Sequence, residues 1–117
     1  MKFEGKVSLI TGGTSGIGAA TALELARRGS DIAITGRKIH SKADAVKAKV
    51  EALGRRCLLL AADMSVPDDL TRVVHETAAE LGSIDVLVHS AGGAVPGSFA
   101  VGPLVILRVA GGWDKWK

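Results

Sequence analysis

Short runs of apolar residues alternate along most of the chain with longer segments rich in Ala, Leu, Lys, Arg and Glu. Four of these runs are nearly continuous in hydrophobicity, and they lie at residues 6–10, 31–35, 57–61 and 84–88. Strands that are covered on both faces, as in a parallel sheet, have this pattern. The runs therefore predict four buried parallel strands.

The segments between the runs predict three helices, at residues 16–28, 41–54 and 65–82. Each helix reaches a glycine shortly before the next strand, and glycine readily adopts the left-handed conformation that ends a helix. The third helix is expected to open at Ser65, with Pro67 in its first turn. Strand and helix thus alternate in a regular order.

This order predicts an α/β fold with a partial, three-layer parallel sheet and helices on both faces. Right-handed crossovers place the strands in the order 3-2-1-4. The order reverses between strands 1 and 4, and ligands of such sheets bind there, beyond the C-terminal ends of the strands. The candidate motifs all lie in loops at those ends.

The alternation of strand and helix patterns stops near residue 94, and Gly and Pro become frequent. We therefore divide the chain into residues 1–93 and an atypical Gly- and Pro-rich tail, residues 94–117. Residues 104–109 form one further apolar run. An uncovered apolar sheet edge invites pairing with another chain. We therefore expect either that this run covers the edge of strand 4 or that the protein self-associates through it.

Composition narrows the class of protein. The 117 residues suit one domain, and the formal charge of +3 comes from basic residues interleaved with acidic ones. Only two Phe and two Trp are present, so a solvated surface is favoured over a nucleic-acid interface. No apolar stretch approaches the roughly 18 residues of a membrane helix. A single cysteine favours a reducing compartment, and the expected location is cytoplasmic.

The segment from Thr11 to Gly18, T-G-G-T-S-G-I-G, follows the first strand and opens the first helix. Glycines allow a tight turn and a close approach to a phosphate, while the helix N-terminus offers free N–H groups to an anion. A P-loop is excluded because no Gly-Lys-Ser/Thr follows. The context favours dinucleotide binding, and a purely structural turn is the alternative.

The spacing T-G-x-x-x-G-I-G resembles that of the short-chain dehydrogenase/reductase family, whose fold is Rossmann-type. Two further motifs agree with this resemblance: A-D-M-S at residues 62–65 and H-S-A-G at residues 89–92. The similarity covers about residues 3 to 93. It implies a cofactor-binding role for the first motif, carried by Gly12, Ser15, Gly16, Ile17 and Gly18.

The resemblance also assigns roles to the other two motifs. Asp63 would accept a hydrogen bond from the adenine amino group, and Met64 would line the ring. Ser90, Ala91 and Gly92 would support the nucleotide from the fourth strand. The alternatives are that Asp63 is a loop residue near a helix start, and that Ser90, which replaces the family's asparagine, is an ordinary small residue beside a turn.

The end of the second strand bears on the choice of nucleotide. Sites for NAD carry a carboxylate there, which binds the ribose 2′-hydroxyl. Residues 35–38 read T-G-R-K instead, and the Arg37 guanidinium suits a 2′-phosphate. In the family such an arginine accompanies NADP, so NADP is the expected cofactor and NAD is less favoured. A solvated arginine is the alternative.

No catalytic residue and no metal site is assigned. Family catalysis uses Asn, Ser, Tyr and Lys, but the sequence contains no Tyr and no Asn. The spacing of the three histidines fits no metal site. The first interpretation is a half-length NADP-binding module that resembles a short-chain oxidoreductase and is inactive alone. The others are a nucleotide-binding or regulatory module without chemistry and a non-functional remnant of a truncated or frame-shifted gene.

Overall fold

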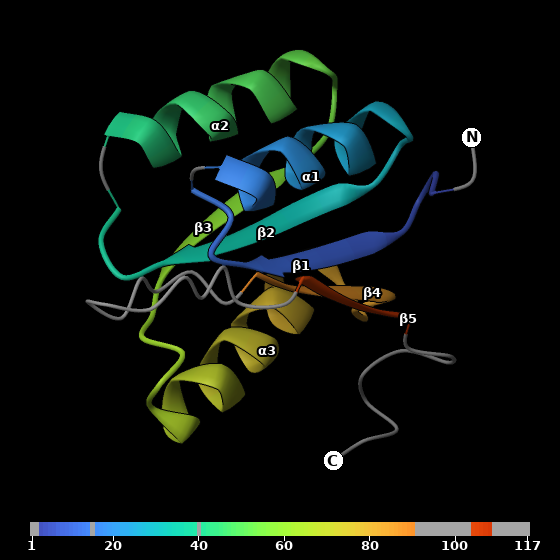
Figure 1. The fold of residues 1–117 in the computed structure, drawn as a ribbon. Coiled ribbons are helices and arrows are strands. Elements are labelled where there is room, and N and C mark those ends of the chain that lie inside the picture. Colours follow the sequence, from blue (N-terminus) through green and yellow to red (C-terminus); the bar gives the residue numbers. More distant parts are fainter. Residues whose placement is uncertain (1–2, 15, 40, 91–103, 109–117) are drawn as a thin grey trace.

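The computed structural model describes residues 3–14, 16–39, 41–90 and 104–108, with the backbone alone described for Ser90 and for residues 104–108. Strands and helices alternate as the sequence predicts (Figure 1). In chain order the elements are β1 (Val7–Thr11), α1 (Gly16–Arg27), β2 (Asp31–Gly36), α2 (Ser41–Ala52), β3 (Cys57–Ala61), α3 (Pro67–Leu81), β4 (Val86–Ser90) and β5 (Leu104–Arg108).

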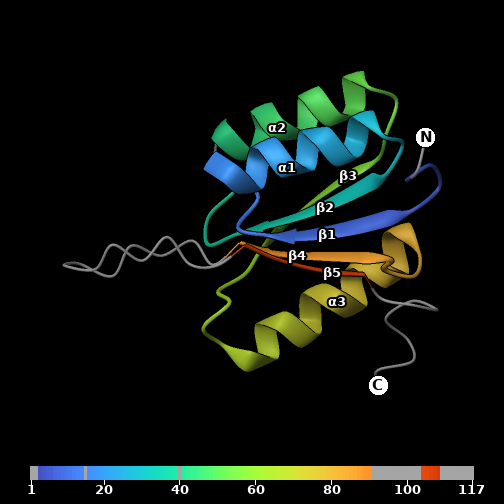
Figure 2. The ribbon, with the colours of Figure 1, turned by 45° about the vertical axis from the view of Figure 1, so that its right-hand side comes forward.

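The strands form one sheet in the order β3-β2-β1-β4-β5, and the first four are mutually parallel. Helices α1 and α2 cover one face of this sheet, and α3 covers the other (Figures 1 and 2). The predicted three-layer architecture and the order 3-2-1-4 are therefore confirmed. The reversal of strand order lies between β1 and β4, with β2 on one side of β1 and β4 on the other.

The fifth strand arises from the apolar run in the tail. It pairs with β4 in the antiparallel direction, with Val88 opposite Ile106 and Ser90 opposite Leu104. Of the two expected outcomes for the edge of β4, the structure shows the one in which this run covers it. The sheet thus includes a strand from residues 94–117, the part of the chain predicted to be a separate tail.

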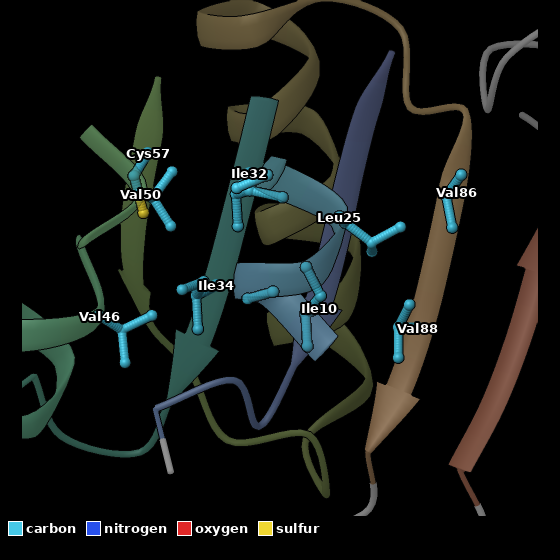
Figure 3. Packing of buried hydrophobic residues seen from close by; sticks show 11 residues of the cluster. Ile10, Leu25, Ile32, Ile34, Val46, Val50, Cys57, Val86 and Val88 are labelled. Carbon is cyan, nitrogen blue, oxygen red and sulfur yellow. The ribbon is translucent and has the colours of Figure 1, made fainter. Parts of the chain in front are cut away.

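Two apolar clusters hold the layers together. Alternate residues of each strand point to opposite faces, so Ile10 joins the cluster beneath α1 and α2 while Leu9 joins the cluster facing α3. Figure 3 shows the first cluster, where side chains from β1, β2, β3 and β4 face Leu25, Val46 and Val50 of the helices. Each buried Val, Leu or Ile contributes about 1.5–3 kcal/mol, against about 0–1 for a surface ion pair. Apolar packing therefore decides the fold.

Helix ends match the glycine pattern. Gly29, Gly54 and Gly82 follow the three helices with φ of 99°, 81° and 102°. The start of α3 differs from the prediction, because the helix begins at Pro67 and its N-cap is Val66, which makes no side-chain cap. The Ser65 hydroxyl is instead hydrogen-bonded to the Asp63 carboxylate, 2.6 Å away. Ser65 therefore serves the preceding loop and not the helix.

Candidate functional site

The C-terminal ends of the four parallel strands meet at one edge of the sheet (Figure 2). The loops that follow β1, β2 and β3 within the described residues contain Gly12, Arg37 and Asp63. The structure therefore brings these three predicted site residues to the same edge of the sheet, the edge that contains the reversal point between β1 and β4 where α/β sheets bind ligands. Ser15, Ala91 and Gly92 lie outside the described residues.

The turn after β1 is tied to β2 by its own N–H groups. Gly12, with φ of 73°, donates to the Thr35 carbonyl at 3.1 Å and lies 3.2 Å from the Thr35 hydroxyl. The N–H of Gly13 donates to the same carbonyl at 3.1 Å. Because these two donors are already used, Gly12 shapes the turn, and an anion would depend on the donors that follow it.

Those later donors belong to the first turn of α1. Gly16 and Ile17 open this helix at the surface, and the Ile17 side chain is 54% exposed. Gly18 is buried, and a Cβ there would collide with the carbonyl oxygen of Gly12. The absence of a side chain at Gly18 therefore lets α1 start directly above the turn. The first turn of α1 lies at the end of the sheet where the parallel strands terminate (Figure 2), so its N–H groups and the positive end of the helix lie at that edge.

Arg37 is the first residue after β2 and is exposed. Among the residues that the structure describes, none forms a hydrogen bond or an ion pair with its guanidinium. A Cβ at the preceding Gly36 would come within 2.7 Å of a methyl group of Thr14, so this loop lies against the glycine-rich turn. The side chain is thus an available cation beside the turn, with no carboxylate in residues 35–38.

The Asp63 carboxylate is fixed by its neighbours. Its Oδ1 atom accepts hydrogen bonds from the Ser65 hydroxyl at 2.6 Å and from the Ser65 N–H at 2.9 Å. These bonds, and to a smaller extent the positive charge of Arg37, hold the pKa of Asp63 below its usual value. No donor from the described residues reaches Oδ2. The group is therefore an ionised acceptor with one oxygen open.

The other predicted positions differ in how far the structure describes them. Met64 is partly buried and packs against the cluster that faces α3. Ser90 ends β4, and its backbone pairs with that of Leu104. Within the described ranges, no three His, Cys, Asp or Glu side chains gather around a possible metal position. No helix there combines the length and apolar character that a membrane crossing requires.

Sequence reasoning missed the polar contacts that support these loops. Thr11 and His89, paired in register on β1 and β4, place Oγ1 and Nδ1 2.8 Å apart at the reversal point. Asp69 accepts the Asp63 N–H at 2.8 Å, and Arg72 donates to the Ala61 carbonyl at 2.7 Å. Parallel register would have suggested the first contact, whereas nothing in the local sequence signals the other two.

Comparison with known proteins agrees with this geometry. The family described as short chain dehydrogenase matches residues 6–103. General stress protein 39 of Bacillus subtilis is 45% identical over 91 residues, covering 78% of this chain and 32% of that protein. Glucose 1-dehydrogenase of Gluconobacter oxydans is 41% identical over 96 residues, covering 81% of this chain and 36% of that protein.

Solved structures resemble the chain over a similar length. A short chain dehydrogenase from Burkholderia cenocepacia, crystallised in complex with NADP, is 43% identical with a TM-score of 0.79, covering 85% of this chain and 40% of that one. A short-chain dehydrogenase/reductase from Serratia marcescens is 32% identical with a TM-score of 0.78 over the same shares. The chain thus spans about a third of the curated relatives' length. By sequence and by fold, it belongs to the short-chain dehydrogenase family.

Proposed function

We propose that this chain is the nucleotide-binding part of an oxidoreductase that acts on alcohol or carbonyl groups, and that it prefers NADP. The observation that carries the preference is Arg37, an exposed cation beside the glycine-rich turn, with no hydrogen-bond or ion-pair partner among the described residues and in a loop without a carboxylate. The NADP complex of the similar Burkholderia protein supports the choice of cofactor class.

The residues of the site fit the parts of such a dinucleotide. The start of α1, at Gly16, Ile17 and Gly18, offers free N–H groups to the pyrophosphate, with Ser15 beside them. Gly12 holds the turn beneath, and Arg37 offers a fork of donors to a 2′-phosphate. When bound, the nicotinamide would supply a hydride donor or acceptor.

The remaining contacts concern the adenosine and ribose portions. Asp63 would accept from the adenine amino group through its open Oδ2 atom, and Met64 would line the ring. Ser90, Ala91 and Gly92 would support the nucleotide from the end of β4. An ionised carboxylate and a free guanidinium on neighbouring loops are complementary to an amino group and a phosphate, respectively.

The cofactor preference is tested by calorimetric titration of the chain with NADPH and with NADH. We expect tighter binding of NADPH, and Arg37→Glu should shrink or reverse the difference because it replaces the phosphate-binding cation by an anion. Lys49→Glu makes the same change of charge at an exposed position on α2 and should leave the ratio unchanged. Equal affinities for the two nucleotides in the unmodified chain would contradict the proposal.

We further propose that the chain alone transfers no hydride at an enzyme-like rate. The alcohol oxygen needs a proton partner in the transition state, and a positioned acid or base contributes a factor of about 10² to 10⁴. The sequence has no Tyr, and the Nδ1 atom of His89 already contacts Thr11. The measurement is NADPH absorbance in the presence of a panel of ketones, aldehydes and 3-oxoacyl thioesters.

The same experiments separate the alternative functions. Binding of NADPH without turnover indicates a nucleotide-binding or regulatory module, which the missing tyrosine favours. Failure to bind any nucleotide indicates a non-functional remnant. Turnover of about 1 s⁻¹ or more, a low but ordinary enzyme rate, that disappears in Gly16→Asp would show that an unrecognised catalytic group is present.

A further inference from the structure

Side chains from the first turns of α3 hold the backbone of the loop that carries Asp63. The Asp63 N–H donates to Oδ2 of Asp69 at 2.8 Å. One helical turn later, Nη2 of Arg72 donates to the carbonyl of Ala61, the last residue of β3, at 2.7 Å. These two side chains also lie 3.8 Å apart as an ion pair. A strand end and the loop after it are thus attached to one helix.

Asp69 occupies the third position of α3, since the helix begins at Pro67. An acidic side chain at this position often reaches back to the N-cap N–H. Here it reaches past the N-cap Val66 to the N–H of Asp63. The adjacent Asp68 is exposed and has no such contact within the described residues. The two neighbouring carboxylates therefore differ in role.

The orientation of the Asp63 side chain follows from these attachments. With its backbone held by Asp69, the carboxylate is turned so that both donors of Ser65 meet Oδ1. Two hydrogen bonds use the acceptor capacity of that oxygen, and no donor from the described residues reaches Oδ2. Rotation of the carboxylate away from this orientation breaks both bonds to Ser65.

We infer that Asp69, Arg72 and Ser65 are positioning residues that hold Asp63 as a reader of the purine 6-position. This inference rests on the proposed function. An ionised carboxylate only accepts hydrogen bonds, so it favours a 6-amino group and repels a 6-oxo oxygen. A fixed carboxylate discriminates between the two groups, whereas one that can rotate or withdraw into solvent does so weakly.

The test compares two dinucleotides that differ only at that position. The full chain is titrated calorimetrically with NADP and with its hypoxanthine analogue, in which an oxo group replaces the adenine amino group. We expect NADP to bind about ten- to a hundredfold more tightly, the value of one hydrogen bond to a charged group. Asp63→Asn, which can donate as well as accept, should abolish or reverse this ratio.

The positioning variants are judged by the same ratio. Asp69→Ala is expected to lower it to within about threefold of unity, because Asp63 loses its backbone anchor while keeping its charge. Asp69→Asn, which retains an acceptor oxygen, should restore most of the ratio. Asp68→Ala is the matched control, since it removes the same charge from the adjacent position. If Asp69→Ala lowers the melting temperature too far for titration, Ser65→Ala provides the second variant, with a several-fold fall in the ratio.

The outcomes separate this inference from the proposed function. If the unmodified chain binds neither dinucleotide, the proposed function is wrong and this inference with it. If it discriminates and Asp69→Ala discriminates equally well, only the positioning role is wrong. An equal loss in Asp68→Ala would also overturn the role, because it would show an effect of net charge and not of the contact between Asp69 and Asp63.

Discussion

Gly18 shows how one position without a side chain determines the geometry of the site. An added Cβ would meet the Gly12 carbonyl oxygen and lie 3.0 Å from the Cα of Gly13, and both of these atoms belong to the backbone. No rotamer change could relieve such a contact. Gly12 cannot retreat either, because its N–H is bonded to Thr35. The turn and the helix therefore fit together only with glycine at this position.

We predict that Gly18→Ala destabilises the chain by about 1–3 kcal/mol, as overpacking does, and weakens NADPH binding at least tenfold (about 1.4 kcal/mol) because the helix start moves away from the turn. Urea unfolding and calorimetry measure the two effects. Gly54→Ala is the control, since that glycine has φ of 81° with open space around it. It should cost about 1 kcal/mol through backbone strain and leave nucleotide affinity unchanged. Equal losses of affinity in both variants would contradict this account.

At the scale of elements, Arg56, which directly precedes β3, joins two elements that are distant in sequence, β2 and α3. Its backbone N–H and its side chain bind the Asp31 carboxylate at the start of β2, with the shortest distance 2.8 Å. It also donates to the carbonyls of Glu80 and Leu81 at the end of α3, at 3.4 and 3.2 Å. That helix has no basic residue in its own last turn. Arg56 therefore supplies the cation that the end of a helix favours.

This contact gives stability a dependence on pH. Partial burial raises the pKa of Asp31, but the hydrogen bonds and charge of Arg56 outweigh burial and hold the pKa below the ordinary value of 3.8. The folded state therefore prefers the ionised form. Its stabilising effect is fully present above the ordinary pKa and is lost as the pH falls through the lower, folded-state value.

We predict that Asp31→Asn lowers the free energy of unfolding by about 1 kcal/mol at neutral pH, a value kept small by the exposure of Arg56. The difference from the unmodified chain should shrink below pH 3.8, once Asp31 itself becomes protonated. Urea unfolding across the acid range measures this. Glu24→Gln removes an exposed carboxylate paired with Arg27 and Arg28, and its effect should be smaller at neutral pH. A difference for Asp31→Asn that is independent of pH would contradict the assignment.

The sequence predicts the elements better than their contacts. Continuous apolar runs located the strands to within two residues, because burial on both faces leaves few other options. The helix ends followed from glycine for a similar local reason. The predicted start of α3 was wrong because Ser65 bonds Asp63 instead of capping the helix. That choice of partner depends on the path of the loop. The glycine-rich turn, Arg37 and Asp63 were visible as motifs, whereas Asp69 and Arg72 act through backbone groups that no sequence pattern marks.

Considered as a whole, the molecule depends on β5 to complete its sheet. The run at residues 104–109 predicted a strand but not its direction, since direction depends on how the chain returns to the sheet. Among pairs of elements with substantial contact, β5 contacts β4 alone. Val86 and Val88 of β4 lie in the core, so this strand is apolar and its outer edge needs a partner.

We predict that a variant ending at Gly93 self-associates, because it leaves the edge of β4 without hydrogen-bonding partners. Light scattering over a range of concentrations should show a larger mean mass than for the full chain. A variant ending at Arg108, which retains β5, is the control and should behave as the full chain does. If the shorter variant remains as soluble and monomeric as the control, β5 is not what protects this edge.

The antiparallel strand β5 also competes with any other polypeptide for the edge of β4. Any second polypeptide that pairs with the outer edge of β4, whatever its source, must first displace β5, which is already attached there. Its apparent dissociation constant is the intrinsic value divided by the fraction of molecules whose β5 is detached. A substitution that weakens the pairing of β5 with β4 would then raise the apparent affinity of the chain for a complementing fragment. The strand that covers β4 thus also controls how tightly another polypeptide can bind there.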